Sequence, residues 1–147
     1  MSERAVELER ATGEQLADVE ALLVGNDLPA ADVREGPGEF FVAFDDGEAV
    51  GIGGLEVAGD VALLRSVVVR EAARGQGYGT AVCDALEREA RNRGVDALYL
   101  LTTTAAGFFA DRGYDRVDRD TAPAALRDTA EFADLCPASA TCMRKHL

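Results

Sequence analysis

The chain has 147 residues, 48% of them hydrophobic and 29% charged, which is enough for one domain with a buried core. Its 27 acidic residues outnumber 15 basic ones, and the net charge of −12 argues against a surface for nucleic acid or an anionic membrane. Residues 1–4 do not begin an apolar signal sequence, and no apolar run is long enough to span a membrane. We therefore expect a single cytoplasmic domain over residues 1–147, with its three cysteines reduced.

Four strands and one helix are predicted in the first part of the chain. The strands are expected at residues 5–10, 39–44, 48–57 and 61–69. Thr12-Gly13-Glu14-Gln15 has the pattern of a capping box, and an apolar stripe from Leu16 to Leu23 follows it. Asp45-Asp46-Gly47 is typical of the turn of a β-hairpin. The order predicts antiparallel strands in this part of the fold.

Helices and strands alternate in the second part. A helix that follows the glycine loop and ends near Gly94 carries a stripe at helical spacing that is expected to be buried, formed by Gly79, Val82, Cys83, Leu86 and Ala90. Residues 98–103 are apolar enough for a central strand. Residues 121–143 predict a helix, a turn marked by proline and a short last strand.

The most informative segment joins the strand at 61–69 to that helix through Gly75, Gly77 and Gly79. Glycines at alternate positions let the backbone approach a ligand closely and turn successive N–H groups toward it. The positive end of the helix dipole lies directly behind them. The segment therefore predicts a cradle for an anion, most naturally a phosphorylated cofactor.

Spacing separates three kinds of glycine loop. A Walker-type loop needs a lysine after its last glycine, but the only lysine is Lys145. A dinucleotide fingerprint needs a third glycine where Thr80 stands, and an acidic residue at the end of the next strand, whereas Asp96 precedes that strand. The pattern Arg74-x-x-Gly77-x-Gly79 instead resembles the pyrophosphate loop of the GNAT acyltransferase superfamily.

A second block strengthens that resemblance. Residues 105–114, Ala-Ala-Gly-Phe-Phe-Ala-Asp-Arg-Gly-Tyr, are similar to the superfamily's helix with two aromatic residues, closed by Gly and an aromatic residue. The resemblance implies an α+β fold: a twisted, mostly antiparallel sheet of six or seven strands, with splayed middle strands and helices on both faces. It also implies acetyl-coenzyme A as cosubstrate and no metal.

The resemblance further implies which residues hold the cosubstrate. The backbone of the last residues of the strand would bind the pantetheine arm, with an N–H near Val68 polarising the thioester carbonyl. The implied set is Val67, Val68, Val69, Arg74, Gly75, Gln76, Gly77, Tyr78, Gly79, Thr80, Thr102, Thr103, Phe108 and Arg112. Their side chains would in part only pack in the core.

Three positions depart from the family pattern. Phe109 replaces a tyrosine that often serves as general acid, Thr102 or Thr103 replaces an asparagine, and Arg65 replaces an acidic residue. Glu56 is the candidate general base, although a strand carboxylate often only faces solvent. Arg65 would favour an anionic acceptor, or else form an ion pair with Glu56 or another acid.

The function implied is acetyl transfer to a small amine by direct attack, without an acyl-enzyme. Residues 64–69, 98–106 and 121–143 are similar to the GNAT subfamily associated with arsenic resistance, so an amino acid-like toxicant or organoarsenical is one expected acceptor. A non-catalytic acyl-coenzyme A sensor and an arsenical-binding protein using Cys136 and Cys142 are the alternatives. A homodimer is an open alternative to a monomer. The excess of acidic residues is typical of proteins from salt-accumulating halophiles, and the alternative is an ordinary acidic protein.

Overall fold

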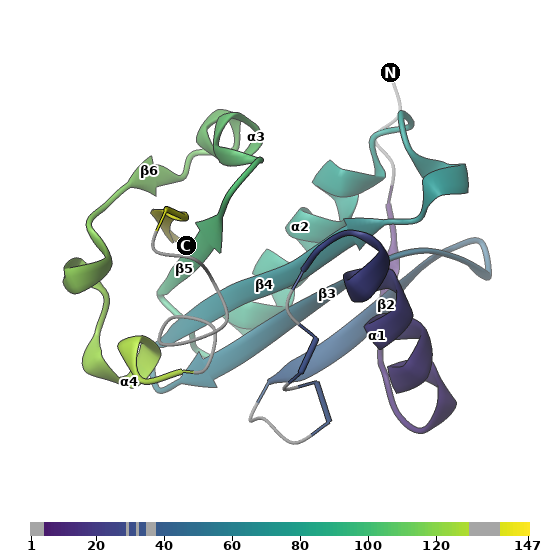
Figure 1. Ribbon diagram of the computed structural model, residues 1–147, viewed down its shortest axis with the longest axis horizontal. Coiled ribbons are helices and arrows are strands. Elements are labelled where there is room, and N and C mark those ends of the chain that lie inside the picture. The colour runs from purple at the N-terminus through teal and green to yellow at the C-terminus, as the bar shows by residue number, and fades with distance from the viewer. Residues whose placement is uncertain (1–4, 29, 32, 35–37, 130–138) are drawn as a thin grey trace.

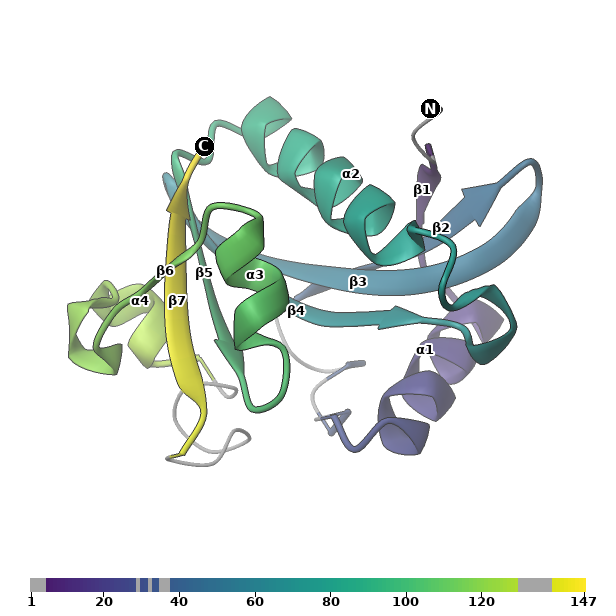
Figure 2. The same cartoon turned by 90° about the horizontal axis from the view of Figure 1, so that it is seen from above.

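The computed structural model describes residues 5–28, 30–31, 33–34, 38–129 and 139–147. Seven strands form one sheet in the order β1-β2-β3-β4-β5-β7-β6, and helices pack on both faces (Figures 1 and 2). The strands are β1 (Glu7–Arg10), β2 (Glu39–Asp45), β3 (Glu48–Ala58), β4 (Val61–Val69), β5 (Ala97–Thr102), β6 (Asp115–Arg116) and β7 (Thr141–His146). The helices are α1 (Glu14–Gly25), α2 (Tyr78–Asn92), α3 (Ala106–Asp111) and α4 (Ala124–Arg127), with 3-10 turns at Glu71–Ala73 and Arg119–Thr121.

The sheet is mostly antiparallel, because only β4 and β5 pair in parallel. This confirms the mixed fold class expected from the sequence. The hairpin between β2 and β3 forms at the predicted turn, where Asp46 and Gly47 both adopt positive φ angles of 52° and 81°. Two central residues with positive φ match the twist of the flanking strands.

Helix α1 begins differently from the capping box that the sequence predicts. Gly13, not Thr12, is the N-cap residue, and it has a φ of 54° that favours glycine. The Thr12 N–H donates to Gln15 Oε1 at 3.3 Å, which is the glutamine half of the box. The helix therefore begins on the expected segment. Of the two hydrogen bonds of a capping box, the one from the Thr12 N–H to the Gln15 side chain is present among the described residues, and no side chain caps the N-terminus of the helix.

The sheet has a hydrophobic core on each face. Val19 and Leu23 of α1 pack with Phe40, Ile52 and Val68 on one face. Helix α2 packs on the other face and buries most of the stripe predicted over Gly79, Val82, Cys83, Leu86 and Ala90. The last four are 0% exposed, whereas Gly79 is only half-buried. Glycines of β3 allow this close packing, because a Cβ on Gly53 would lie 2.4 Å from Leu86 Cδ1.

A β-bulge in β4 lies at the centre of the sheet, beside the point where β4 and β5 separate. Gly54 pairs with Arg65 and Ile52 with Val68, so two residues of β4, Ser66 and Val67, stand opposite Gly53. Ser66 takes a φ of 62°, in the left-handed region. The parallel ladder with β5 runs only from Val61–Ala97 to Leu63–Tyr99, after which the strands diverge (Figure 2). The splayed middle strands expected from the sequence are present.

The C-terminal part follows the predicted order of helix and last strand. Leu126 of α4 is buried with Tyr99 and Cys142 against β5 and β7. Residues 130–138, which include Cys136, lie outside the described residues. None of the described helices is long and apolar enough to cross a membrane.

Candidate active site

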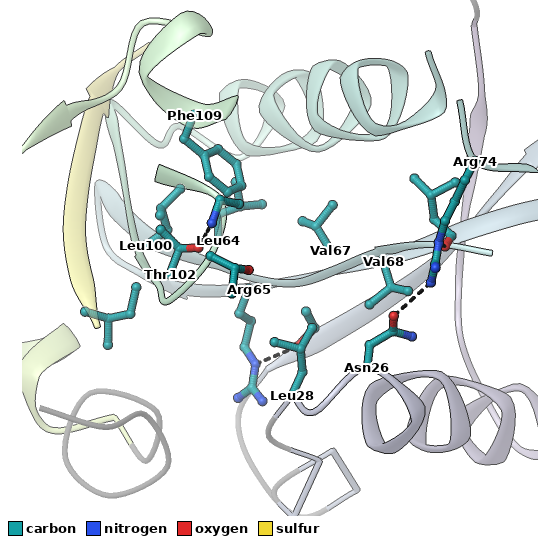
Figure 3. Close-up of a pocket in the computed structure, with 15 residues that line it drawn as sticks. Asn26, Leu28, Leu64, Arg65, Val67, Val68, Arg74, Leu100, Thr102 and Phe109 are labelled. Carbon is teal, nitrogen blue, oxygen red and sulfur yellow. Dashed lines mark hydrogen bonds between the residues drawn. The ribbon is translucent and has the colours of Figure 1, made fainter. Parts of the chain in front are cut away.

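A cavity of about 290 Å³ lies where β4 and β5 separate (Figure 3). Val67 and Phe109 reach it from the α2 side of the sheet, and Arg65 and Leu28 from the α1 side. The full lining is Asn26, Leu28, Leu64, Arg65, Ser66, Val67, Val68, Val69, Arg74, Leu100, Leu101, Thr102, Thr104, Ala105 and Phe109. Two arginines and no carboxylate stand among these residues, and Glu56, the carboxylate paired with Arg65, lies outside the lining. The charged groups that face the cavity are therefore positive, in a chain of net charge −12. Such a cavity suits an anionic ligand.

The glycine loop has the backbone geometry that an anion cradle needs. Gly75 and Gly77 have φ angles of 77° and 85°, which side chains rarely allow. The first intrahelical bond of α2 runs from the Ala81 N–H to the Gly77 carbonyl at 3.2 Å. The backbone N–H groups of residues 78–80 therefore have no partner within the helix. They are available to an anion at the positive end of the helix dipole.

The expected cosubstrate residues divide into two groups. Val67, Val68, Val69, Arg74 and Thr102 line the cavity, whereas Thr103 is exposed and does not. Gln76 and Tyr78 line a separate cavity of about 450 Å³ beside Arg70. The Tyr78 hydroxyl donates to Asp45, so this phenol faces β2 and not the β4–β5 gap.

The two aromatic residues of α3 have different surroundings. Phe109 is buried and lines the cavity at the position where the family pattern has a phenol. Phe108 is 38% exposed, and a Cβ on Gly79 would lie 3.6 Å from its ring. The first turn of α2 and helix α3 therefore meet through Gly79 and Phe108, beside the glycine loop.

Arg65 and Glu56 form a buried ion pair, one of the two arrangements expected from the sequence. Arg65 Nη1 lies near Glu56 Oε1, Arg65 Nε donates to Ser66 Oγ at 2.9 Å, and the guanidinium lies over the Phe40 ring. Arg65 lines the cavity, but Glu56 does not. Gly54 leaves room for this arrangement, because a Cβ there would lie 3.0 Å from Phe40 and 3.3 Å from Arg65.

Arg112 lies in a network of charges between α2, α3 and β7. Its Nη2 is 2.7 Å from Asp84 Oδ1 and 2.9 Å from Glu87 Oε2. Glu87 also accepts from Lys145 at 2.8 Å and from the Tyr114 hydroxyl at 3.1 Å. Burial, together with the negative charge of Glu87, raises the pKa of Tyr114 well above its usual value. The guanidinium of Arg112 is thus held by two carboxylates, and Tyr114 does not line the cavity.

The described cysteines have the character of core residues. Burial raises the pKa of the Cys83 thiol to about 12, and burial also raises the pKa of Cys142. No group of three histidines, cysteines or carboxylates that could hold a metal occurs in the described part of the chain. The suggested pair of Cys136 and Cys142 is outside this comparison, because Cys136 is not described.

Sequence reasoning missed the wall that follows α1. Asn26 and Leu28 line the cavity beside Arg65, although they are distant from it in sequence. The available signal was the Gly-Asn-Asp segment at the end of an amphipathic helix, which is typical of a C-cap. It shows where the helix ends but not which strand the cap faces. The glycines of β3 were likewise a signal of close backbone approach.

A mixed sheet that opens over a cavity beside a glycine loop and a helix N-terminus is the fold that the motifs indicate. The structure of N-acetylglutamate synthase from Neisseria gonorrhoeae, complexed with coenzyme A and N-acetyl-glutamate, has a TM-score of 0.77 at 19% identity; the match covers 99% of this chain and 36% of that one. A Mycobacterium tuberculosis protein in complex with coenzyme A has a TM-score of 0.73 at 25% identity, covering 96% and 99%.

Sequence comparison gives the family. A Bacillus subtilis (strain 168) protein described as an acetyltransferase is 27% identical over 92 residues, which are 62% of this chain and 63% of that protein. The match thus spans less than two thirds of this curated relative. Residues 6–116 match the Acetyltransferase (GNAT) family. The chain belongs to this family.

Proposed function

We propose that this protein transfers the acetyl group of acetyl-coenzyme A to the amino group of a small anionic acceptor. The observation that carries the proposal is the cavity between β4 and β5, with the glycine loop at its Arg74 end. The backbone amides of residues 78–80 suit the diphosphate of coenzyme A. The edge of β4 beyond the bulge suits an extended pantetheine arm, which would bind as an added strand.

The reaction needs one bond to form and one to break. The neutral amine attacks the thioester carbonyl, and the resulting oxyanion is stabilised by a β4 amide near Val68. The carbon–sulfur bond then breaks, the thiolate takes the electron pair, and the proton of the amine passes to solvent water. The phenols of Tyr78 and Tyr114 donate hydrogen bonds to Asp45 and Glu87. This favours departure of the thiolate without protonation by either phenol. A thiol pKa of about 8.5 makes that departure feasible.

Arg65 supports the anionic class of acceptor, because its guanidinium reaches the cavity wall, whereas Glu56, the carboxylate paired with it, does not line the cavity. Glu56 as general base stays a prediction. Its carboxylate does not line the cavity, and its nearness to Arg65 favours a role in holding that side chain. Retained acetyl transfer by Glu56→Gln across the pH range would remove Glu56 as the base.

Thiol release from acetyl-coenzyme A tests the function. We would use L-glutamate first, because N-acetyl-glutamate lies in the gonococcal structure, and compare it with L-glutamine, a neutral amine and an amino-bearing organoarsenical. Acceptor-dependent release supports an acetyltransferase, and a preference for anionic amines that Arg65→Ala abolishes supports the acceptor class. Binding of coenzyme A without release by any amine would favour the non-catalytic sensor.

Narrower proposals concern setting and partners. The organoarsenical acceptor rests on the subfamily resemblance alone, and release with the other amines but not with the arsenical would contradict it. A cytoplasmic location and function at high salt are proposed from the composition. A homodimer stays a prediction that light scattering would test.

A further inference from the structure

Arg74 differs from the other arginines whose contacts the structure defines, because it is held by neutral oxygens. Its Nε donates to the Val69 carbonyl at 3.2 Å, and its Nη2 donates to Asn26 Oδ1 at 2.8 Å (Figure 3). Among the described residues it has no carboxylate partner. In the described part of the chain, Arg10, Arg34, Arg65, Arg93 and Arg112 each lie within ion-pair distance of a carboxylate.

Asn26 is itself fixed by the end of α1. Its Nδ2 donates to the Leu22 carbonyl at 2.8 Å, and its backbone N–H donates to the Leu23 carbonyl at 3.1 Å. Asp27, with a φ of 58°, and the bond from Leu28 N–H to the Leu23 carbonyl complete a Schellman motif. The amide oxygen of Asn26 therefore faces the guanidinium from a rigid helix end.

We infer that Asn26 is a positioning residue, which aims the Arg74 guanidinium at the cavity and leaves its charge uncompensated. An aspartate would still offer an acceptor oxygen to Arg74 but would neutralise its charge. The neutral amide matters because a chain of net charge −12 repels an anionic ligand at long range, so attraction must come from nearby cations. The inference rests on the proposed function, since the anion would be a phosphate of coenzyme A.

The test compares coenzyme A binding by calorimetry at low and high KCl in three variants. Asn26→Asp keeps the acceptor oxygen but adds a compensating charge, Asn26→Ala removes the oxygen, and both lose the bond to Leu22. Asn92→Asp is the matched control, because Asn92 is the last residue of α2 and does not line the cavity. It adds the same charge at a helix end elsewhere.

We expect Asn26→Asp to raise the Kd for coenzyme A about fivefold at low salt, as for the loss of an exposed ion pair worth about 1 kcal/mol. Salt should weaken binding less in Asn26→Asp than in the wild type, whereas Asn26→Ala keeps the wild-type salt dependence with a weaker affinity. Asn92→Asp should bind as the wild type does. Thermal unfolding identifies any variant that is merely less stable.

Two results would overturn the inference while leaving the proposed function intact. The first is equal affinity and salt dependence in the wild type and Asn26→Asp. The second is the same loss in Asn26→Asp and Asn92→Asp, which would mean that net charge alone matters. A wild-type protein that gives no heat with coenzyme A would overturn the proposed function as well.

Discussion

The guanidinium of Arg65 lies 3.5 Å from the carboxylate of Glu56, and their side chains are 0% and 4% exposed. The pair joins two neighbouring strands on the α1 side of the sheet, next to the bulge whose residues Ser66 and Val67 line the cavity. Burying two charges costs desolvation free energy, which is offset only while both partners are present. The stability of the fold therefore depends on Arg65, the same cation that we propose to bind the anionic acceptor.

Removing one partner should cost more stability than removing both. Glu56→Leu leaves the Arg65 charge buried without this partner, and we expect a loss of about 3 to 5 kcal/mol in the free energy of unfolding. The double variant Glu56→Leu, Arg65→Met should recover most of that loss but should not distinguish anionic from neutral amines. Urea denaturation and acceptor profiling measure the two effects. Equal losses in the single and double variants would contradict the pairing argument.

Ser66 should tolerate glycine better than valine. Its φ of 62° costs an L-residue about 1 to 2 kcal/mol, a cost that glycine avoids and a β-branched residue increases. Because Ser66 Oγ accepts from Arg65 Nε, the glycine variant also loses one hydrogen bond, so we expect its net change in stability to be small. Ser66→Val should lose stability and coenzyme A affinity together. A valine variant with unchanged affinity would mean that the bulge does not shape the cavity.

Glycines at two sites should respond oppositely to alanine. A Cβ on Gly51 would lie 2.6 Å from the Val68 carbonyl oxygen, so Gly51→Ala must shift backbone and should destabilise by roughly 1 to 3 kcal/mol. A Cβ on Gly107 in α3 meets nothing within 4 Å, so Gly107→Ala should stabilise by about 0.5 to 1 kcal/mol. Denaturant midpoints compare the two. A stable Gly51→Ala protein would show that β3 and β4 can separate at little cost.

Stability should fall in alkaline solution because of buried acidic groups that stay neutral in the folded protein. The pKa of Cys83 is raised from 9.0 to about 12 by burial, so the unfolded chain loses this proton first. The stabilisation is present below pH 9 and is lost as the pH rises toward 12. Cys83→Ala should flatten this decline in denaturation series from pH 8 upward, while Tyr114 still contributes. An unchanged slope in the alanine variant would locate the alkaline loss elsewhere.

Salt should raise thermal stability if the acidity is a halophilic adaptation. At a net charge of −12, carboxylates repel one another, and molar KCl shortens the Debye length to about 3 Å. We expect the melting temperature to rise between low and molar KCl. A melting temperature independent of KCl would indicate an ordinary acidic protein.

The sequence predicted most elements of the fold because their signals are local. Hydrophobic periodicity placed α2 and its buried stripe, and Asp46-Gly47 placed the hairpin turn. The capping box at Thr12 was only half formed, since Gly13 adopts a backbone conformation that begins the helix one residue later than Thr12 would. The first residue of a helix depends on which of two neighbouring residues takes the N-cap position, and a sequence pattern does not decide between them.

The features of the site likewise divide into those with a local sequence signal and those without one. By itself, the sequence determined the glycine loop, the strand before it and the family, because glycine spacing fixes a backbone shape wherever the chain lies. Only the tertiary structure decided that Arg65 faces Glu56, that carboxylates hold Arg112, and that Arg74 meets Asn26. These partners come from different elements, and their meeting depends on strand register and helix docking, which no local pattern encodes.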